Sequence, residues 1–169
     1  GFNYGVAAIC NLVGRSASVD LSSSIVTGSG HSLRALANDG PATIDVAYTD
    51  YDPTKTQVLG PTGAINAGPG NLNVSPGFAG PADFRLLRTS PLVNAGDPAG
   101  LAVGESLTDV AGRPRIAFGR RDIGAHELQP LPPTIPPTSE PKPDTRDQFT
   151  FVDGSPTFEK IKARGSLVV

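Results

Sequence analysis

The stretch that decides the fold runs from Ser90 to Glu127. It reads SPLVNAGDPAG over residues 90–100, then a short spacer, then TDVAGRPRIAFGRRDIGAHE over residues 108–127. Its glycines and prolines follow one another too closely for a helix, so they predict turns and irregular chain. Two of its arginines stand among four of its acidic residues, which indicates a structure closed by buried ion pairs. The residues expected to do this are Asp97, Asp109, Arg113, Arg115, Asp122 and Glu127.

Each of these side chains has an expected contact. Asp97 is expected to accept backbone N–H groups in an Asx turn. Asp109 and Asp122 are spaced to meet Arg113 and Arg115, because the planar guanidinium suits paired contacts with a carboxylate. Glycines in the same stretch are expected where φ is positive or where two chain segments approach closely. These glycines are Gly112, Gly119 and Gly124.

The same motifs resemble a known signature. The pattern SPxxxAGD, followed by TDxxGxxR and ending in DIGAxE, is similar to that of the choice-of-anchor Q domain, found at the C-terminal end of right-handed parallel β-helices in bacterial surface and secreted proteins. The similarity is close over residues 90–127 and loose over residues 25–127, with His126 where the family usually has Tyr. The resemblance implies an architecture and a secreted or cell-surface location, and it names no substrate.

Upstream of this stretch, short pieces of period-two alternation predict strands. Two such pieces are Ala17–Val26 and Ala42–Tyr48, and residue pairs recur at intervals of about 23 residues, a spacing typical of repeat architectures. A β-sandwich fits the spacing equally well, and the resemblance favours stacked coils. The recurring pairs are Ser24-Ile25, Tyr48-Thr49 and Asn71-Leu72. The expected fold is all-β, with the terminal coils and C-terminal cap of a right-handed parallel β-helix over residues 1–128.

Between the last repeat and the signature, apolar residues predict a lid. Phe78 and Phe84 are expected to fold back with the nearby aliphatic side chains over the open end of the apolar core, because terminal repeats need capping. The aliphatic residues are Leu86, Leu87, Leu92 and Val93. The resemblance implies the same position for this segment.

Beyond Glu127 the composition changes. Seven of the fourteen residues 130–143 are proline, which predicts an extended polyproline II linker over residues 129–148. Alternation returns after it, with Phe149 and Phe151, and predicts the start of a further β module over residues 149–169.

Composition excludes several classes of function. The chain has 169 residues, enough for one domain, and its 20 Gly and 17 Pro without Trp or Met disfavour helices. The net charge of −2 comes from interspersed acids and bases, so no basic stripe predicts nucleic-acid binding. No apolar run is long enough to insert in a membrane. No signal peptide follows the first residue, which is Gly, so a fragment of a longer protein is expected. A monomer is expected, with the single Cys10 packed in the interior.

Three functions follow from these observations. The first is a non-catalytic structural module that caps a solenoid and links it to an anchor or a further domain. The second is the C-terminal part of a polysaccharide lyase or glycoside hydrolase with its active residues upstream, because paired carboxylates serve both chemistries. The third is a carbohydrate-binding surface with Tyr48 and Tyr51 as its exposed rings and a cell-surface polysaccharide as its partner.

The sequence predicts no catalytic, cofactor-binding or metal-ligating residue in this chain. Calcium at Asp50 and Asp52 stays open as an alternative to an Asp-rich turn, because hard cations prefer clustered oxygens. His31 and His126 have no second His or Cys at ligand spacing, so His31 is expected at the surface and His126 packed or hydrogen-bonded.

Overall fold

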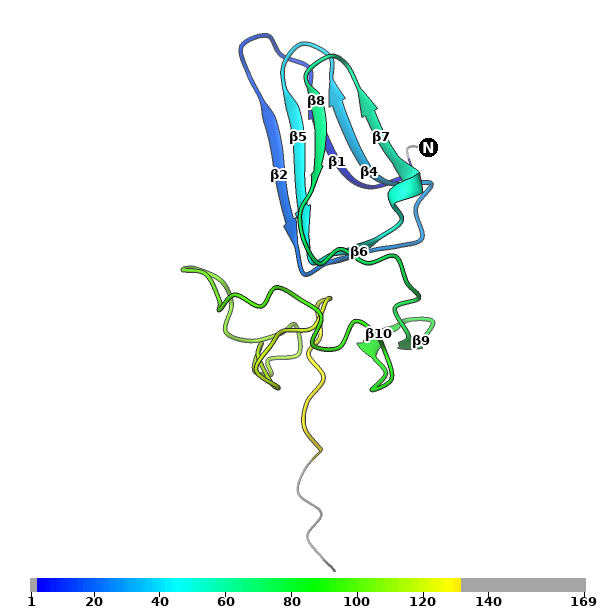
Figure 1. The fold of residues 1–169 in the computed structure, drawn as a ribbon, viewed down its shortest axis with the longest axis vertical. Helices are drawn as coiled ribbons and strands as arrows, with labels where there is room; N and C mark the ends of the chain where they lie inside the picture. Colours follow the sequence, from blue (N-terminus) through cyan, green and yellow to red (C-terminus); the bar gives the residue numbers. More distant parts are fainter. Residues whose placement is uncertain (1–2, 132–169) are drawn as a thin grey trace, which may run out of the picture. The chain divides into compact units, whose positions relative to one another are not determined.

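The computed structural model describes residues 3–131, and they form an all-β structure (Figure 1). The linker expected at 129–148, beyond its first three residues, and the module expected at 149–169 lie outside the described residues. Besides the strands there is one short 3-10 helix, η1, at Pro53–Lys55. The strands are β1 Tyr4–Cys10, β2 Ala17–Ser22, β3 Ile25–Val26, β4 His31–Ala37, β5 Ala42–Ala47, β6 Asp50–Tyr51, β7 Thr56–Leu59, β8 Gly63–Ala67, β9 Phe78–Gly80 and β10 Asp83–Leu86.

Each of the first strands pairs in parallel with the strand that follows three places later. The sheets have the orders β1-β4-β7, β2-β5-β8 and β3-β6, and Leu72 extends the last through a parallel bridge to Asp50. The chain therefore visits three parallel sheets in turn and returns to the first. We call each such passage a coil: coil 1 covers residues 4–26, coil 2 residues 31–51 and coil 3 residues 56–72.

The corner between the second and third sheets repeats with a left-handed residue. In every coil this residue stands two places before the residue that enters the third sheet, namely Ile25, Asp50 and Leu72. The sequence-based alignment placed Thr49 opposite Ile25, and this was wrong by one residue, because coil 1 and coil 2 differ in length. The left-handed residues are Ser23 (φ 49°), Tyr48 (φ 48°) and Gly70 (φ 71°). Such a conformation costs a non-glycine residue about 1–2 kcal/mol, so the corner contacts must compensate.

The core of the coils consists of small and aliphatic side chains that alternate along the strands, together with Tyr51. Leu33, Ile44 and Val46 are almost completely buried. Cys10 is buried and unpaired, as expected, and its thiol lies 3.3 Å from the carbonyl oxygen of Arg15. The in-register alternation explains why each strand shows one face to the core.

Residues 73–130, here called the C-terminal segment, contain little regular structure. β9 and β10 form a short antiparallel hairpin, which the prolines in this region did not predict. A second, smaller core forms around Leu86, Leu92 and Ile123. The glycines expected at positive φ are confirmed: Gly112 (76°), Gly119 (81°) and Gly124 (128°).

The C-terminal segment contacts the side of the coils that carries β3 and β6. The Gly124 amide donates to the Ser23 carbonyl oxygen (2.9 Å) in coil 1, and the Val74 amide donates to Asp50 Oδ1 (2.9 Å) in coil 2. In coil 3, Leu72 packs against the second core. The segment thus touches all three coils along one side (Figure 1).

The lid expected over the end of the core is not what the structure shows. Among the described residues no strand pairs with the outer edges of β7 and β8. Phe84 is 60 % exposed and Leu87 is 48 % exposed, so neither covers the core. Leu86 and Leu92 are buried, but in the second core beside β3 and β6. Four residues of the predicted group do pack together, but against a different surface: Leu86 and Leu92 are buried, and Phe78 and Val93 pack against them.

Candidate functional site: the carboxylate cluster

Three carboxylates are buried in the C-terminal segment. Asp109, Asp122 and Glu127 are 7 %, 1 % and 3 % exposed. Carboxylates are almost never buried without partners, because ionised oxygens lose much hydration energy. Their hydrogen bonds therefore define what the cluster does.

Asp109 closes the turn that follows it and reaches the end of the segment. Its Oδ1 accepts the amides of Ala111 (2.8 Å) and Arg113 (2.9 Å), and its Oδ2 accepts the amide of Glu127 (2.9 Å). Burial alone raises the pKa of a carboxyl, but these three donors together hold the pKa of Asp109 below its usual value.

Asp122 joins two stretches that are distant in sequence. Its Oδ1 accepts the amide of Asn94 (2.7 Å), and its Oδ2 accepts the amide of Leu128 (2.7 Å). Next to it, the Ile123 amide donates to the Leu92 carbonyl oxygen (3.0 Å). Burial raises the pKa of Asp122 and outweighs the two donors and Arg115.

Glu127 is the most strongly perturbed group of the cluster. Its Oε2 accepts the Asp122 amide (2.9 Å), and its Oε1 lies 3.0 Å from Nη1 of Arg115. That Nη1 donates its hydrogen bond to the Gly124 carbonyl oxygen (2.8 Å), so the contact with Glu127 is an ion pair without hydrogen-bond geometry. Burial, with the nearby charges of Asp122 and Asp109, raises the pKa of Glu127 to about 7, against the effects of the Asp122 amide and Arg115.

The expected ion pairs were wrong in their partners. Arg115 pairs with Glu127, whereas Asp109 and Asp122 use their oxygens on backbone amides. Arg113 is exposed, and within residues 3–131 it takes part in no ion pair. The spacing suggested charge pairs, but a carboxylate in an irregular chain meets more amides than guanidinium groups.

Asp97 forms the expected Asx turn. Its Oδ1 accepts the Ala99 amide (2.8 Å), which confirms that prediction. Its own amide donates to Ser23 Oγ (3.0 Å), so the turn is also attached to the corner of coil 1.

Two further arginines form hydrogen bonds within the C-terminal segment, and the sequence analysis did not single them out. Arg121 is 4 % exposed, pairs with Glu105 and donates to the carbonyl oxygens of Ala99 (3.2 Å) and Gly100 (3.1 Å). Arg120 donates from Nε to the Gly96 carbonyl oxygen (2.6 Å). The available signal was the pair of adjacent arginines in the motif GRRDIGAHE. Guanidinium groups satisfy carbonyl oxygens here in the same way that carboxylates satisfy amides.

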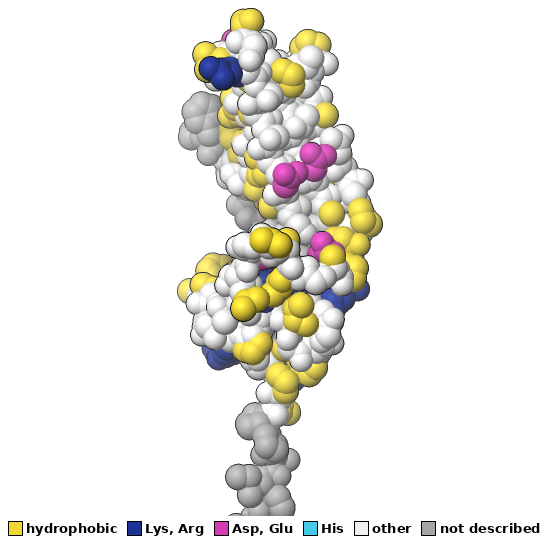
Figure 2. All heavy atoms as spheres, turned by 90° about the vertical axis from the view of Figure 1, so that its left-hand side faces the viewer, with side chains coloured by type: hydrophobic (Ala, Val, Ile, Leu, Met, Phe, Trp, Pro, Cys, Tyr) yellow, Lys and Arg dark blue, Asp and Glu magenta, His cyan; other side chains and the backbone are white. Residues whose placement is uncertain are grey.

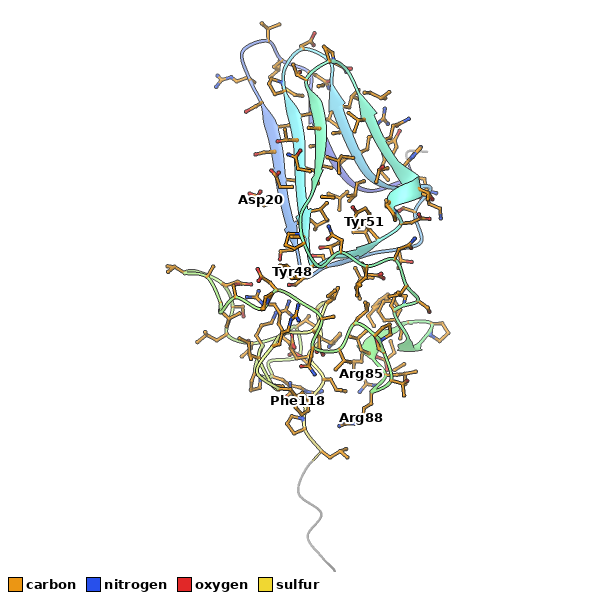
Figure 3. The ribbon with its side chains drawn as sticks, viewed as in Figure 1. Asp20, Tyr48, Tyr51, Arg85, Arg88 and Phe118 are labelled. Carbon is orange, nitrogen blue, oxygen red and sulfur yellow. The ribbon has the colours of Figure 1, made fainter. Side chains whose placement is uncertain are left out.

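The tyrosines expected to form a sugar-binding surface are not exposed together. Tyr51 is 6 % exposed and belongs to the core of the coils, which corrects that prediction. Tyr48 lies at the left-handed corner, where the Arg120 guanidinium is 5.7 Å from its ring centre. Figure 3 shows Tyr51 between the sheets and Tyr48 next to the C-terminal segment.

Asp50 and Asp52 have separate roles in the described structure. Asp50 is 3 % exposed and accepts the Val74 amide, and burial raises its pKa. Asp52 caps η1 by accepting the Thr54 amide (2.9 Å) and lies 3.7 Å from Nζ of Lys55. Within residues 3–131 no group of three or more His, Cys, Asp or Glu side chains is arranged as a metal site.

The two histidines also differ from each other. His31 stacks on Tyr4 with ring centres 5.6 Å apart and is only partly exposed. His126 is half-buried, as expected for a packed side chain, and its Nδ1 has no hydrogen-bond partner among the described residues.

A second acidic group lies on the outer face of the β2-β5-β8 sheet. Asp20, Asp45 and Asn66 stand opposite one another in register, and Asn66 Nδ2 donates to Asp45 Oδ1 (2.8 Å). Figure 2 shows acidic side chains on an otherwise largely uncharged surface. This ladder follows directly from the parallel register, which the sequence did not specify to the residue.

No protein-family model matches the chain, and no curated protein and no solved structure matches it either. In the part of the chain that the structure describes, no helix has the length and apolar character needed to cross a membrane.

Proposed function

We propose that this chain is a non-catalytic structural module of a secreted or cell-surface protein. In this proposal the coils are the last turns of a right-handed parallel β-helix, and the C-terminal segment braces them. Residues 129–148 then link this unit to an anchor or to the further module at 149–169. The pairing of each strand with the third strand after it supports a β-helix, and right-handed crossover is the general rule for parallel strands.

One observation carries the structural role. All six carboxylate oxygens of Asp109, Asp122 and Glu127 contact groups of the chain itself. Five of them accept hydrogen bonds from backbone amides. The sixth, Oε1 of Glu127, lies 3.0 Å from Nη1 of Arg115. A general acid or base needs an oxygen within hydrogen-bond reach of a substrate. These carboxylates instead hold the irregular segment together, and other groups, such as the Gly124 and Asp97 amides, attach it to the coils.

The expected location and partner rest on the resemblance to choice-of-anchor Q domains. That resemblance favours a module next to an attachment region of a bacterial surface protein, and the proposed binding partner of the parent protein is a cell-surface polysaccharide. The alternative of a lyase or hydrolase with its active residues upstream has no specific support in the described residues.

The catalytic alternative is tested directly on the purified chain. Incubation with polygalacturonate and calcium should give neither the ultraviolet absorbance of unsaturated products nor new reducing ends. Turnover that is present in the parent chain and lost in Asp109→Asn would overturn the structural proposal. Equal folding of the two proteins, checked by circular dichroism, is the control.

A further inference from the structure

A pocket of about 520 Å³ lies where coil 1 meets the C-terminal segment. Coil 1 contributes the turn around β3, including Ser22, Ser24 and Thr27, and the C-terminal segment contributes Phe78, Phe84 and Arg115. The volume is within the range of small-molecule sites. One wall is aromatic and the other carries hydroxyl groups.

The second core accounts for only one of the two rings in the aromatic wall. Phe78 and Phe84 meet edge to face, with ring centres 5.4 Å apart and planes at 87°. Phe84 is nevertheless 60 % exposed, and only Phe78 packs against the second core. A large aromatic side chain left open in a concave site is typical of a surface that receives a ligand.

The polar wall offers unused hydrogen-bonding groups. Among the described residues, the hydroxyls of Ser22 and Thr27 make no hydrogen bond, whereas Ser24 Oγ donates to the Ser22 carbonyl oxygen (2.8 Å). Arg115 donates from Nη1 to the Gly124 carbonyl oxygen. Its Nε and Nη2 donate to no acceptor in residues 3–131, and its side chain is 16 % exposed.

We propose that this pocket binds a neutral saccharide of one or two pyranose rings. The apolar face of a sugar ring fits the Phe84 side chain, and its hydroxyls fit the serine and threonine hydroxyls and the free guanidinium donors. A neutral sugar is favoured because Glu127 lies 3.0 Å from Arg115 and balances its charge when it is ionised, which holds at pH 8, the pH of the binding test below. This function goes beyond the structural role and uses a different surface from the tyrosines named in the sequence.

The test uses the full chain and saturation-transfer NMR with calorimetric titration at pH 8. The neutral probes are cellobiose, lactose and di-N-acetylchitobiose, and the anionic probe is digalacturonate. We expect at least one neutral disaccharide to bind and digalacturonate to bind more weakly. Phe84→Ala should weaken that binding about 10-fold or more, because a central aromatic contact dominates a small site.

Phe118→Ala is the matched control. Phe118 is a phenylalanine of the same segment, 47 % exposed and not among the residues that line this pocket (Figure 3). Its removal should leave sugar binding unchanged. Phe84→Ala also removes the edge-to-face contact with Phe78, so binding of both variants is compared below their melting temperatures.

A second variant tests the polar wall. Thr27→Val keeps the shape of the exposed side chain and removes its hydroxyl, and binding should weaken several-fold. The proposal is overturned if no neutral probe binds, if digalacturonate alone binds, or if Phe84→Ala and Phe118→Ala affect binding equally. Any of these results would leave the structural role of the carboxylate cluster untouched, because that role predicts stability and not ligand binding.

Discussion

The coils and the C-terminal segment satisfy their backbone polar groups by different means. In the coils, amides and carbonyls pair from strand to strand in parallel ladders around a core that contains Leu33 and Ile44. In the C-terminal segment few strands form, and buried carboxylates accept the amides while arginines serve the carbonyls. Buried backbone groups must be paired in either case. The difference shows how a segment with little regular structure can still adopt one defined conformation.

The stabilities of the two regions should depend on pH to different extents. A backbone ladder carries no ionisable group, whereas the segment depends on carboxylates whose charge changes with pH. The two regions should therefore respond differently to the same perturbation.

Removal of the Arg115 guanidinium should cause the largest loss of stability. Arg115→Ala leaves Glu127 buried without its cation, and we expect a loss of about 3–5 kcal/mol at pH 8 in urea denaturation. The loss should be smaller at pH 5, because the pKa of Glu127 is already raised and the carboxyl can bind a proton.

The control is Arg113→Ala, the neighbouring arginine without an ion pair among the described residues. It should cost about 1 kcal/mol or less. A denaturation midpoint for Arg115→Ala equal to that of the parent protein would show that the pair contributes nothing.

A cavity in the coils should cost nearly as much but should not depend on pH. Ile44→Ala removes a fully buried side chain and should cost about 2–5 kcal/mol. The same difference is expected at pH 5 and pH 8 in urea denaturation. Val58→Ala, at a position 46 % exposed, is the control and should cost much less. A strong pH dependence of the Ile44→Ala effect would contradict the claim that only the stability of the C-terminal segment depends on ionisable groups.

Glu127 should make the free energy of unfolding fall as pH rises. In the unfolded chain this carboxyl ionises near 4.5, and in the folded protein its pKa is about 7. Between these values the folded state holds a proton that the unfolded state has released, so stability falls through this window by about 3 kcal/mol and then levels off.

Glu127→Gln should remove this part of the pH dependence while it keeps an acceptor for the Asp122 amide. Urea denaturation of parent and variant from pH 4.5 to pH 8 measures the difference. Carboxyls distant from Glu127 cancel in the comparison, whereas Asp109 and Asp122 interact with its charge and contribute to the difference. Equal slopes in the two proteins would contradict the assigned pKa.

The sequence predicted the coils better than the segment, for physical reasons. Alternation in Ala42–Tyr48 predicted a strand because it is a local pattern. The recurrence of strand signals fitted a β-sandwich equally well, and only the family resemblance favoured stacked coils. The one-residue error at Thr49 arose because the repeat is not uniform: Asp50 follows Ile25 by 25 residues, whereas Leu72 follows Asp50 by 22. The buried position of Tyr51 was missed because a two-residue strand has too few positions to show alternation.

In the segment, the sequence identified the acidic residues but not their partners. Asp97 was placed correctly because an Asx turn is local, two residues long. Asp122 binds Asn94 and Leu128 amides whose positions depend on the whole fold, so spacing could not reveal them. The contact side was also unpredictable, since it depends on the outward direction of Ile25 and Leu72.

Amide hydrogen exchange tests the central claim most directly. The amides of Asn94, Arg113, Glu127 and Leu128 lie outside strands, yet each donates to a buried carboxylate. NMR at pH 7 should show them protected to a degree similar to amides of β5, and Asp122→Ala should remove the protection at Asn94 and Leu128 first. Exchange of these amides at the rate of an unstructured chain, with β5 still protected, would contradict the account.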